Sequence, residues 1–165
     1  MSYTIRTLVK EDWPTVKRIY EDGLATGLAT FETEVPSYEK WVNQTSPACR
    51  LVLEEQHQIL GWCKLSLVSS RKVYEGVGEV SVYVDSAHKG KGIGNLLLQA
   101  LIRASEEEGV WTLQASIFPE NHASLQLHLK NGFREVGRRE RIGQLTGVWH
   151  DTILLERRSR LNGWD

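Results

Sequence analysis

The stretch from Val80 to Ala104 constrains the fold more than any other part of the chain. Hydrophobic and polar residues alternate from Val80 to Asp85, which is the period of a half-buried β-strand. The next apolar residues recur at helical spacing, so that one helix face is apolar: Ile93, Leu96, Leu97, Ala100, Leu101 and Ala104. Three glycines at alternate positions separate the two periods: Gly90, Gly92 and Gly94. The stretch is therefore predicted to form a strand, a tight turn and a helix.

The turn between these two elements has the properties of a phosphate-binding site. The first N–H groups of a helix have no partner inside it, and the helix dipole adds partial positive charge there. Glycines allow the backbone to approach a ligand closely and to adopt positive φ. Lys89 and Lys91 add positive charge. We expect a cradle of amide donors for a pyrophosphate, the alternative being a surface turn that merely needs glycines.

The spacing of the glycines excludes two common phosphate motifs. The pattern G-x-G-x-x-G requires a third glycine where Asn95 or Leu97 stands, and a P-loop requires Gly-Lys-Ser/Thr, which does not occur. What remains, residues 89–94 (Lys-Gly-Lys-Gly-Ile-Gly), resembles the (Arg/Gln)-x-x-Gly-x-Gly/Ala loop of the GCN5-related N-acetyltransferase (GNAT) family. In that family the loop binds the pyrophosphate of acetyl-coenzyme A. Lys89 stands where the family usually carries Arg or Gln.

The composition is that of one packed domain. The chain has 165 residues, of which 41% are hydrophobic and 25% are charged, so disorder is not expected. We expect a single domain over residues 1–165. The formal net charge of -1 argues against nucleic acid as a general partner. No signal peptide and no apolar run of transmembrane length is visible, so we expect no membrane partner and a cytoplasmic location.

The cysteines and histidines form no recognisable motif. Cys49 and Cys63 lie far apart without C-x-x-C, which favours free thiols in a reduced compartment. The five histidines contain no H-E-x-x-H, and His122 and His128 are not spaced as a ligand pair on one helix face. We therefore expect no metal. Cys63 has no adjacent histidine, so a covalent acyl-enzyme through its thiol is disfavoured.

Strand and helix patterns alternate along the rest of the chain, and several strands are adjacent in sequence. Period-two patterns predict further strands over residues 3–9, 50–54, 59–68, 111–117, 133–141 and 148–156. Together these patterns predict an α/β fold in which one mixed sheet carries helices on both faces.

Local signals predict where several elements begin and end. Asp12, Ser37 and Asn121 are residue types that cap helix N-termini, so helices are expected to follow them. The last two strands are expected to form a hairpin across residues 143–147. The polar tail, residues 157–165, is expected to fray.

A second segment is similar to the GNAT family. Residues 119–124 (Pro-Glu-Asn-His-Ala-Ser), followed by Asn131-Gly132-Phe133, look like the family's N-x-x-(A/S)…GF segment. The resemblance implies that Asn121 and the helix start, with Ser124, help to hold the pantetheine arm of the coenzyme. From the residues alone Asn121 is a helix cap, and both roles are compatible. The resemblance also implies a mostly antiparallel sheet with a splayed parallel strand pair.

Four further pieces resemble the phosphinothricin acetyltransferase branch of that family. They are Thr30-Phe31-Glu32-Thr33, Gly78-Glu79-Val80-Ser81-Val82-Tyr83-Val84, Leu127-His128 and Gly147-Val148-Trp149-His150-Asp151. The likeness covers nearly the whole chain. It implies direct transfer of the acetyl group of acetyl-coenzyme A, in a ternary complex, to the amine of a small amino-acid-like acceptor. Phosphinothricin and methionine sulfoximine are such acceptors. Relatives in this branch often dimerise, so a homodimer is expected.

Glu79 is the candidate general base. An amine with a pKa of about 8 to 10 is protonated near neutral pH and must lose a proton to attack a thioester. A carboxylate near the carbonyl carbon accepts that proton directly or through water. By the resemblance, Glu79 stands at the branch's proposed base, and the strand period gives it the same face as Ser81 and Tyr83. The alternative is a strand carboxylate that pairs with a neighbouring Lys or Arg.

Other groups complete the predicted site. The backbone N–H groups of Val82, Tyr83 and Val84 are expected to stabilise negative charge on the thioester oxygen and, by the resemblance, to bind the pantetheine. His128 is a candidate acid for the leaving thiolate. The alternatives are a buried helix histidine without a proton role and an unprotonated leaving group, since a thiol has a pKa of only about 8.5. Predicted pyrophosphate contacts are Lys89, Gly90, Lys91, Gly92, Ile93, Gly94 and Asn95.

The acceptor contacts are expected at Phe31, Ser81 and Arg71. A basic pair formed by Arg71 and Lys72 would bind a carboxylate or phosphinate, the alternative being solvated loop charges. Glu32 and Glu34 would instead suit a cationic acceptor.

Two rival functions are compatible with these residues. One is acetyl transfer to a different amine, such as a protein N-terminus or an aminoglycoside. The other is a coenzyme-binding module without catalysis, against which the presence of Glu79 and Asn121 argues.

Overall fold

A single seven-stranded sheet runs through the molecule. The computed structural model describes residues 2–43 and 45–165. The sheet order is β1-β2-β3-β4-β5-β7-β6. The strands are β1 (Thr4–Thr7), β2 (Arg50–Glu55), β3 (Gln58–Leu67), β4 (Val77–Val84), β5 (Thr112–Ile117), β6 (Arg134–Leu145) and β7 (Val148–Arg158). Every neighbouring pair is antiparallel except β4 and β5, which are parallel.

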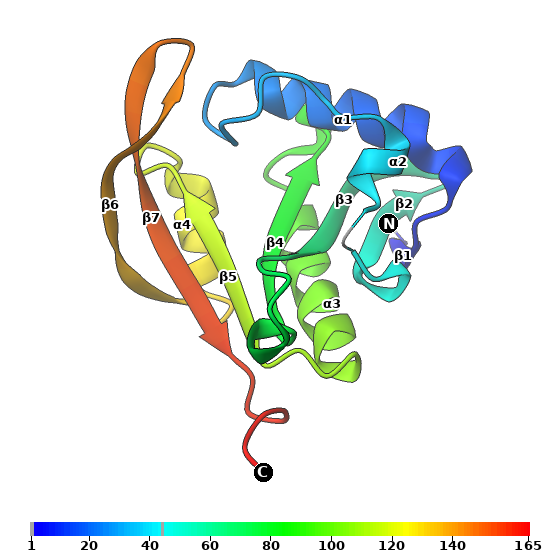
Figure 1. The fold of residues 1–165 in the computed structure, drawn as a ribbon. Coiled ribbons are helices and arrows are strands. Elements are labelled where there is room, and N and C mark those ends of the chain that lie inside the picture. Colours follow the sequence, from blue (N-terminus) through cyan, green and yellow to red (C-terminus); the bar gives the residue numbers. More distant parts are fainter. Residues whose placement is uncertain (1, 44) are drawn as a thin grey trace.

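Helices cover both faces of this sheet (Figure 1). The α-helices are α1 (Trp13–Ala25), α2 (Tyr38–Trp41), α3 (Ile93–Glu107) and α4 (His122–Leu129), and short 3-10 turns are η1 (Lys10–Asp12), η2 (Pro47–Cys49), η3 (Lys72–Tyr74) and η4 (Ser86–His88). One core cluster lies between the sheet and α3, where Leu97 and Leu101 are fully buried. A second packs α1 and α2 on the sheet through Ile19, Trp41 and Trp62. The predicted mixed sheet with helices on both faces is confirmed.

The parallel pair holds together at one end only. β4 and β5 pair from Val77↔Thr112 to Glu79↔Gln114, and no further pair joins them. Beyond that point the two strands diverge, as Figure 1 shows for the green and yellow arrows. The predicted splayed pair is therefore confirmed, and it opens the sheet in its middle.

A helix follows each of the three predicted cap residues, and two of the three side chains make the cap hydrogen bond. Ser37 Oγ accepts a hydrogen bond from the Lys40 amide, and Asn121 Oδ1 accepts one from the Ser124 amide. Asp12 precedes α1 but makes no cap hydrogen bond. Its carboxylate instead accepts two hydrogen bonds from the Arg6 guanidinium, at 2.8 and 2.9 Å, because a charged partner outcompetes the helix amides.

The chain end differs from its prediction. β6 extends to Leu145, so the hairpin turn is only Thr146-Gly147 rather than residues 143–147. The tail does not fray. Arg158 donates to the carbonyls of Trp111, Ser159, Asn162 and Gly163, and Trp164 covers its guanidinium. A planar group with five donors can bind several carbonyls at once, which fixes a polar segment that lacks an apolar core.

Candidate active site

A cleft of about 770 Å³ occupies the opening between β4 and β5. Most of the residues predicted from sequence line it: Phe31, Glu79, Ser81, Val82, Tyr83, Val84, Lys89, Gly90, Gly92, Ile93, Gly94, Asn121, Ser124 and His128. These residues come from the loop after α1, from β4, from the glycine turn and from α4. The fold therefore brings distant parts of the sequence to one place.

Three predicted residues do not line the cleft. Lys91 is exposed beside it. Asn95 Oδ1 accepts a hydrogen bond from Asn131 Nδ2 at 2.9 Å, so this side chain links α3 to the end of α4. Arg71 is exposed at the start of η3 and lies over the Tyr74 ring, 5.4 Å from its centroid. The predicted roles of these side chains at the site remain predictions.

The backbone of β4 presents free groups to the cleft. The Asp85 amide donates to Leu60 on β3, at 2.8 Å, and continues the antiparallel register of β3 with β4. Backbone groups of successive residues in such a ladder point to opposite sides. Tyr83 therefore bonds β3, whereas the N–H groups of Val82 and Val84 point toward β5, which has already diverged. Two of the three predicted backbone donors thus face the cleft.

The glycine turn has the backbone conformation that the sequence requires. Gly90 and Gly92 have φ of +77° and +79°, a region that disfavours other residues, and α3 begins directly after Gly92. The first amides of α3 point out of the helix at this end of the cleft. Lys89 supplies positive charge beside them. This arrangement suits a diphosphate, the group expected from the sequence.

Asn121 joins the two sides of the cleft entrance. Besides capping α4, it donates through Nδ2 to the Leu28 carbonyl at 3.2 Å, which ties α4 to the loop after α1. Ser124 uses its amide for this cap. The cap role of Asn121 is confirmed, and its predicted role in holding the coenzyme arm stays a prediction.

Glu79 lies at the point where β4 and β5 separate. Burial raises the pKa of its carboxyl group above the ordinary value, while a hydrogen bond from the Gln114 side chain and the charge of Arg139 act in the opposite direction. A carboxylate with a raised pKa is a better proton acceptor than an ordinary exposed one. The environment of Glu79 therefore suits a general base.

His128 is held in one tautomer. Its Nδ1 lies 2.7 Å from the Ser124 carbonyl oxygen, which can only accept, so the proton is on Nδ1. In the neutral ring Nε2 then carries a lone pair and accepts. Burial lowers the pKa of His128, which disfavours the imidazolium that would be needed to donate from Nε2. The geometry therefore favours a hydrogen-bond acceptor over the acid expected from the sequence.

An aromatic wall borders the cleft near Phe31. The Phe31 ring contacts that of Phe118 edge to face, with centroids 4.9 Å apart. Phe118 in turn stacks on His150, with centroids 5.0 Å apart. Phe118 was missed in the sequence, and only its place after a predicted strand could have indicated it. Phe31 also packs closely on Gly143 of β6, where an added Cβ would lie 3.1 Å from the ring and the ring would have to shift slightly.

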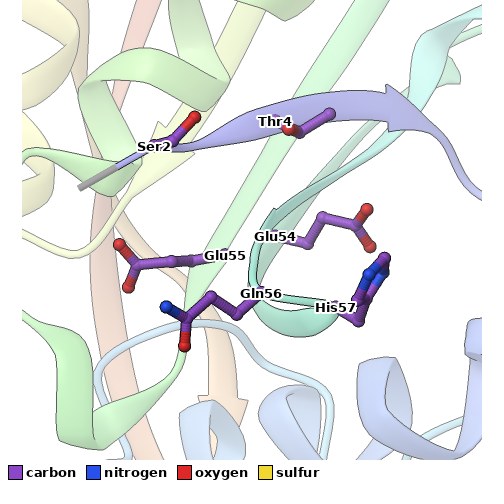
Figure 2. A pocket seen from close by; sticks show the side chains of 6 residues that line it. All are labelled: Ser2, Thr4, Glu54, Glu55, Gln56 and His57. Atoms are coloured by element: carbon purple, nitrogen blue, oxygen red, sulfur yellow. The ribbon is translucent and has the colours of Figure 1, made fainter.

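A second hollow, of about 480 Å³, shares no lining residue with this cleft, and Figure 2 shows the side chains around it. It is lined by Ser2 and Thr4 at β1 and by residues 54–57 around the β2–β3 turn. Its Glu54 carboxylate is paired with Arg6 at 3.0 Å. No residue singled out in the sequence lies there, so the hollow contributes nothing to the predicted chemistry.

The cysteines lie outside the cleft. Both thiols are buried and free, and burial raises the pKa of Cys49 to about 11 and that of Cys63 further. Such thiols are poor nucleophiles near neutral pH. Within residues 2–43 and 45–165, no three His, Cys, Asp or Glu side chains gather in a way that could hold a metal ion. Over the same residues, no helix has the length and apolar character needed to cross a membrane.

Comparisons with known proteins agree with this geometry. Residues 5–133 match the model of the acetyltransferase (GNAT) family. The chain is 34% identical to a phosphinothricin N-acetyltransferase of Alcaligenes faecalis, over 93% of this chain and 81% of the relative. It is 28% identical to an L-methionine sulfoximine/L-methionine sulfone acetyltransferase of Pseudomonas paraeruginosa, over 94% of both chains.

A solved structure has the same fold. It is a GNAT superfamily phosphinothricin acetyltransferase of Sinorhizobium meliloti in complex with acetyl-coenzyme A, with a TM-score of 0.87 and 27% identity. The match covers 98% of this chain and 90% of that one. The chain therefore belongs to the GNAT acetyltransferase family, and the family, the fold and the enzyme class expected from the sequence are confirmed.

Proposed function

We propose that this enzyme transfers the acetyl group of acetyl-coenzyme A directly to the amine of a small amino-acid-like acceptor, of the phosphinothricin or methionine sulfoximine type. The observation that carries the proposal is one continuous cleft in which the Glu79 carboxylate, the open β4 edge and the glycine turn meet. The names of the relatives in Alcaligenes and Pseudomonas support this acceptor class. We propose that residues 1–165 act as one domain.

Each part of the cleft then has a task. The amides from Gly90 to Asn95, with the charges of Lys89 and Lys91, bind the pyrophosphate, and Asn121 and Ser124 border the pantetheine arm. Acetyl-coenzyme A supplies the activated acyl group as a thioester. The Val82 and Val84 amides donate to the carbonyl oxygen, on which negative charge develops. Phe31 and Ser81 border the acceptor.

The proton of the acceptor ammonium passes to Glu79. The free amine attacks the thioester carbonyl carbon and a C–N bond forms. The nitrogen then releases its second proton to solvent, and the C–S bond breaks with its electron pair on sulfur. Because neutral His128 presents an acceptor at Nε2, we propose that solvent rather than His128 protonates the thiolate, or that the thiolate leaves unprotonated. His128 instead accepts a hydrogen bond within the cleft.

The assembly and setting are also proposals. The β6–β7 hairpin exposes a run of large apolar side chains: Val136, Ile142, Val148 and Trp149. Water-exposed apolar surface of this kind suits a contact between subunits, so we propose a homodimer through this hairpin. The free, buried cysteines support a cytoplasmic setting.

Coenzyme release tests the function. A thiol reagent follows release from acetyl-coenzyme A in the presence of phosphinothricin, methionine sulfoximine, an aminoglycoside and an N-terminal peptide. Release stimulated most by the first two supports the proposal. Release stimulated most by a peptide or an aminoglycoside would assign a different acceptor, and no stimulation by any amine would indicate a non-catalytic coenzyme-binding module.

A further inference from the structure

Thr152 is a buried hydroxyl without a partner in the wall of the cleft. Its side chain lies on β7, the residue is 4% exposed, and it lines the same cleft as Glu79. Among residues 2–43 and 45–165, its Oγ1 is one of the few buried side-chain polar atoms without a hydrogen-bond partner. A buried polar atom left unpaired is costly, which indicates a partner that the protein alone does not supply.

The strand register places Thr152 on the same sheet face as Glu79. Glu79 lies opposite Gln114 of β5, and Gln114 lies opposite Glu156 of β7. Side chains alternate along a strand, so Thr152, four residues before Glu156, points to the same face. Glu79 and Thr152 therefore face the same cleft from two places in its wall, with β5 between their strands.

Arg139 lies directly opposite Thr152 in the β6–β7 ladder. Directly opposed residues share a face, with Cβ atoms about 5 Å apart. The charge of Arg139 helps to lower the pKa of Glu79, so its field reaches the reacting end of the cleft. Neither a hydrogen bond nor an ion pair of Arg139 is found within the part of the chain that the structure describes.

Groups of two residues near Arg139 are hydrogen-bonded to Asp151. Asp151 accepts a hydrogen bond from Arg138 Nε at 2.7 Å and another from the Arg141 amide at 2.8 Å. These bonds stabilise a β-bulge, at which the pairing register of β6 with β7 shifts between Arg139 and Gly143. Asp151 thus binds the side chain of Arg138 and the backbone of Arg141, and the register leaves Arg139 opposite Thr152.

We infer that Arg139 and Thr152 form an anion subsite that binds the α-carboxylate of the acceptor. A guanidinium and a hydroxyl are both donors, and together they suit a carboxylate oxygen pair. A zwitterionic amino acid then places its ammonium toward Glu79 and its carboxylate toward β6. This inference rests on the proposed function, and it assigns to Arg139 the role that was expected of Arg71.

The test compares an acceptor with and without its negative charge. L-methionine sulfone and its α-carboxamide share the same amine-bearing carbon, and only the first carries a carboxylate. The ratio of their kcat/KM values is measured for the wild-type enzyme and the Arg139→Met, Thr152→Val, Arg71→Met and Arg103→Met variants. This ratio cancels any effect of Arg139 on the proton affinity of Glu79, because both acceptors use the same base.

The wild-type enzyme is expected to prefer L-methionine sulfone, which carries the carboxylate, to its α-carboxamide. Arg139→Met should reduce this preference about 10- to 100-fold, the usual weight of a hydrogen bond to a charged group, and Thr152→Val about 3- to 10-fold. Arg71→Met and Arg103→Met, an exposed control on α3, should leave it unchanged. A preference unaffected by Arg139→Met and Thr152→Val, or abolished by Arg71→Met alone, would overturn the subsite.

Calorimetry of L-methionine sulfone binding in the presence of coenzyme A separates this inference from the catalytic proposal. Binding that weakens in Arg139→Met, in an enzyme that acetylates no amine, would support the subsite and reject the proposed function. Turnover with an affinity that does not depend on Arg139 would reject the subsite alone. Absence of both binding and turnover in the wild-type enzyme would reject both.

Discussion

Glu79 of β4 and Gln114 of β5 face each other across the last pair at which these two parallel strands are joined. Their side chains are hydrogen-bonded, and beyond them the sheet opens into the cleft. The candidate base therefore lies at the vertex of the opening, where its backbone is fixed by pairing on both sides. The same position buries the carboxylate, which links its proton affinity to the stability of the fold.

Replacing Glu79 by Gln should stabilise the fold near neutral pH. Because burial raises the native pKa, protonation of Glu79 favours the native state below the unfolded pKa of about 4.3, and this contribution is lost as pH rises through the native pKa. The neutral amide avoids the cost of a buried charge. Thermal melts should give Glu79→Gln the higher Tm at pH 8 and no advantage at pH 4. A higher wild-type Tm at pH 8 would contradict this account.

Gly92→Val should weaken coenzyme binding beyond what its backbone strain explains. Gly92 and Gly109 lie at opposite ends of α3 with φ of +79° and +82°, and an added Cβ meets no atom within 4 Å at either. Each valine should therefore cost a similar stability, about 1–3 kcal/mol. Only Gly92→Val should also lower acetyl-coenzyme A affinity, by about tenfold or more, because it distorts amides that grip phosphate.

Calorimetry with acetyl-coenzyme A compares the two glycine variants, with Gly109→Val as the matched control for strain. Equal affinities in the two variants would mean that the turn does not hold the coenzyme.

His128→Asn should keep the helix hydrogen bond but remove the titrating ring. The asparagine amide can still donate to the Ser124 carbonyl, whereas the contact of the ring with Phe133, at 5.0 Å, is lost. Because the native pKa of His128 is lowered, its stabilising contribution is present above about pH 6.5 and falls as the pH decreases. The wild-type enzyme should therefore be more stable than His128→Asn at pH 8, and this difference in stability should decrease as the pH is lowered.

Chemical denaturation measures the difference in unfolding free energy between the wild-type enzyme and His128→Asn. The measurements run from pH 5 to 8, which is about the range over which an ordinary histidine titrates. A difference that is constant with pH would show that the ring titrates normally in the fold. An alkaline decline of wild-type kcat that disappears in His128→Asn would restore the acid role for this residue.

Trp149→Lys should dissociate the proposed dimer. Trp149 is 53% exposed on the β6–β7 hairpin, so a lysine there costs the isolated subunit little, typically within about 0.5 kcal/mol. Sedimentation velocity should find dimers for the wild-type protein and monomers for the variant. Trp164→Lys in the tail is the control, because that ring covers Arg158 rather than the hairpin. A monomeric wild-type protein would reject the dimer.

Much of the site was predictable because its signals are local. Hydrophobic periodicity and the backbone preference of glycine suffice to predict the strand, the glycine turn and the helix within residues 80–104. Ser37 and Asn121 are adjacent to the helices that they cap. The Asp12 side chain makes no cap hydrogen bond to α1 because its carboxylate is bonded to Arg6 on β1. The tail was mispredicted because Arg158 binds, besides carbonyls of the tail itself, the Trp111 carbonyl that only the folded sheet brings near.

The anion subsite could not be predicted from the sequence. Arg139 and Thr152 meet only because β6 carries a bulge that sets their register, and nothing in the local sequence fixes where a bulge lies. The basic pair at Arg71 was the more visible candidate, but η3 directs Arg71 onto Tyr74. Charge alone therefore predicted an anionic group on the acceptor, and it could not indicate which arginine would contact that group.

The most direct test of the whole account is a comparison of turnover and coenzyme affinity in Glu79→Gln, with methionine sulfoximine as acceptor. If Glu79 is the base beside the thioester, kcat should fall about 10²- to 10⁴-fold while the Kd for acetyl-coenzyme A is unchanged. The wild-type rate should also rise with pH through a pKa above that of an ordinary carboxyl group, a rise that the variant lacks. An unchanged kcat at neutral pH would contradict the account.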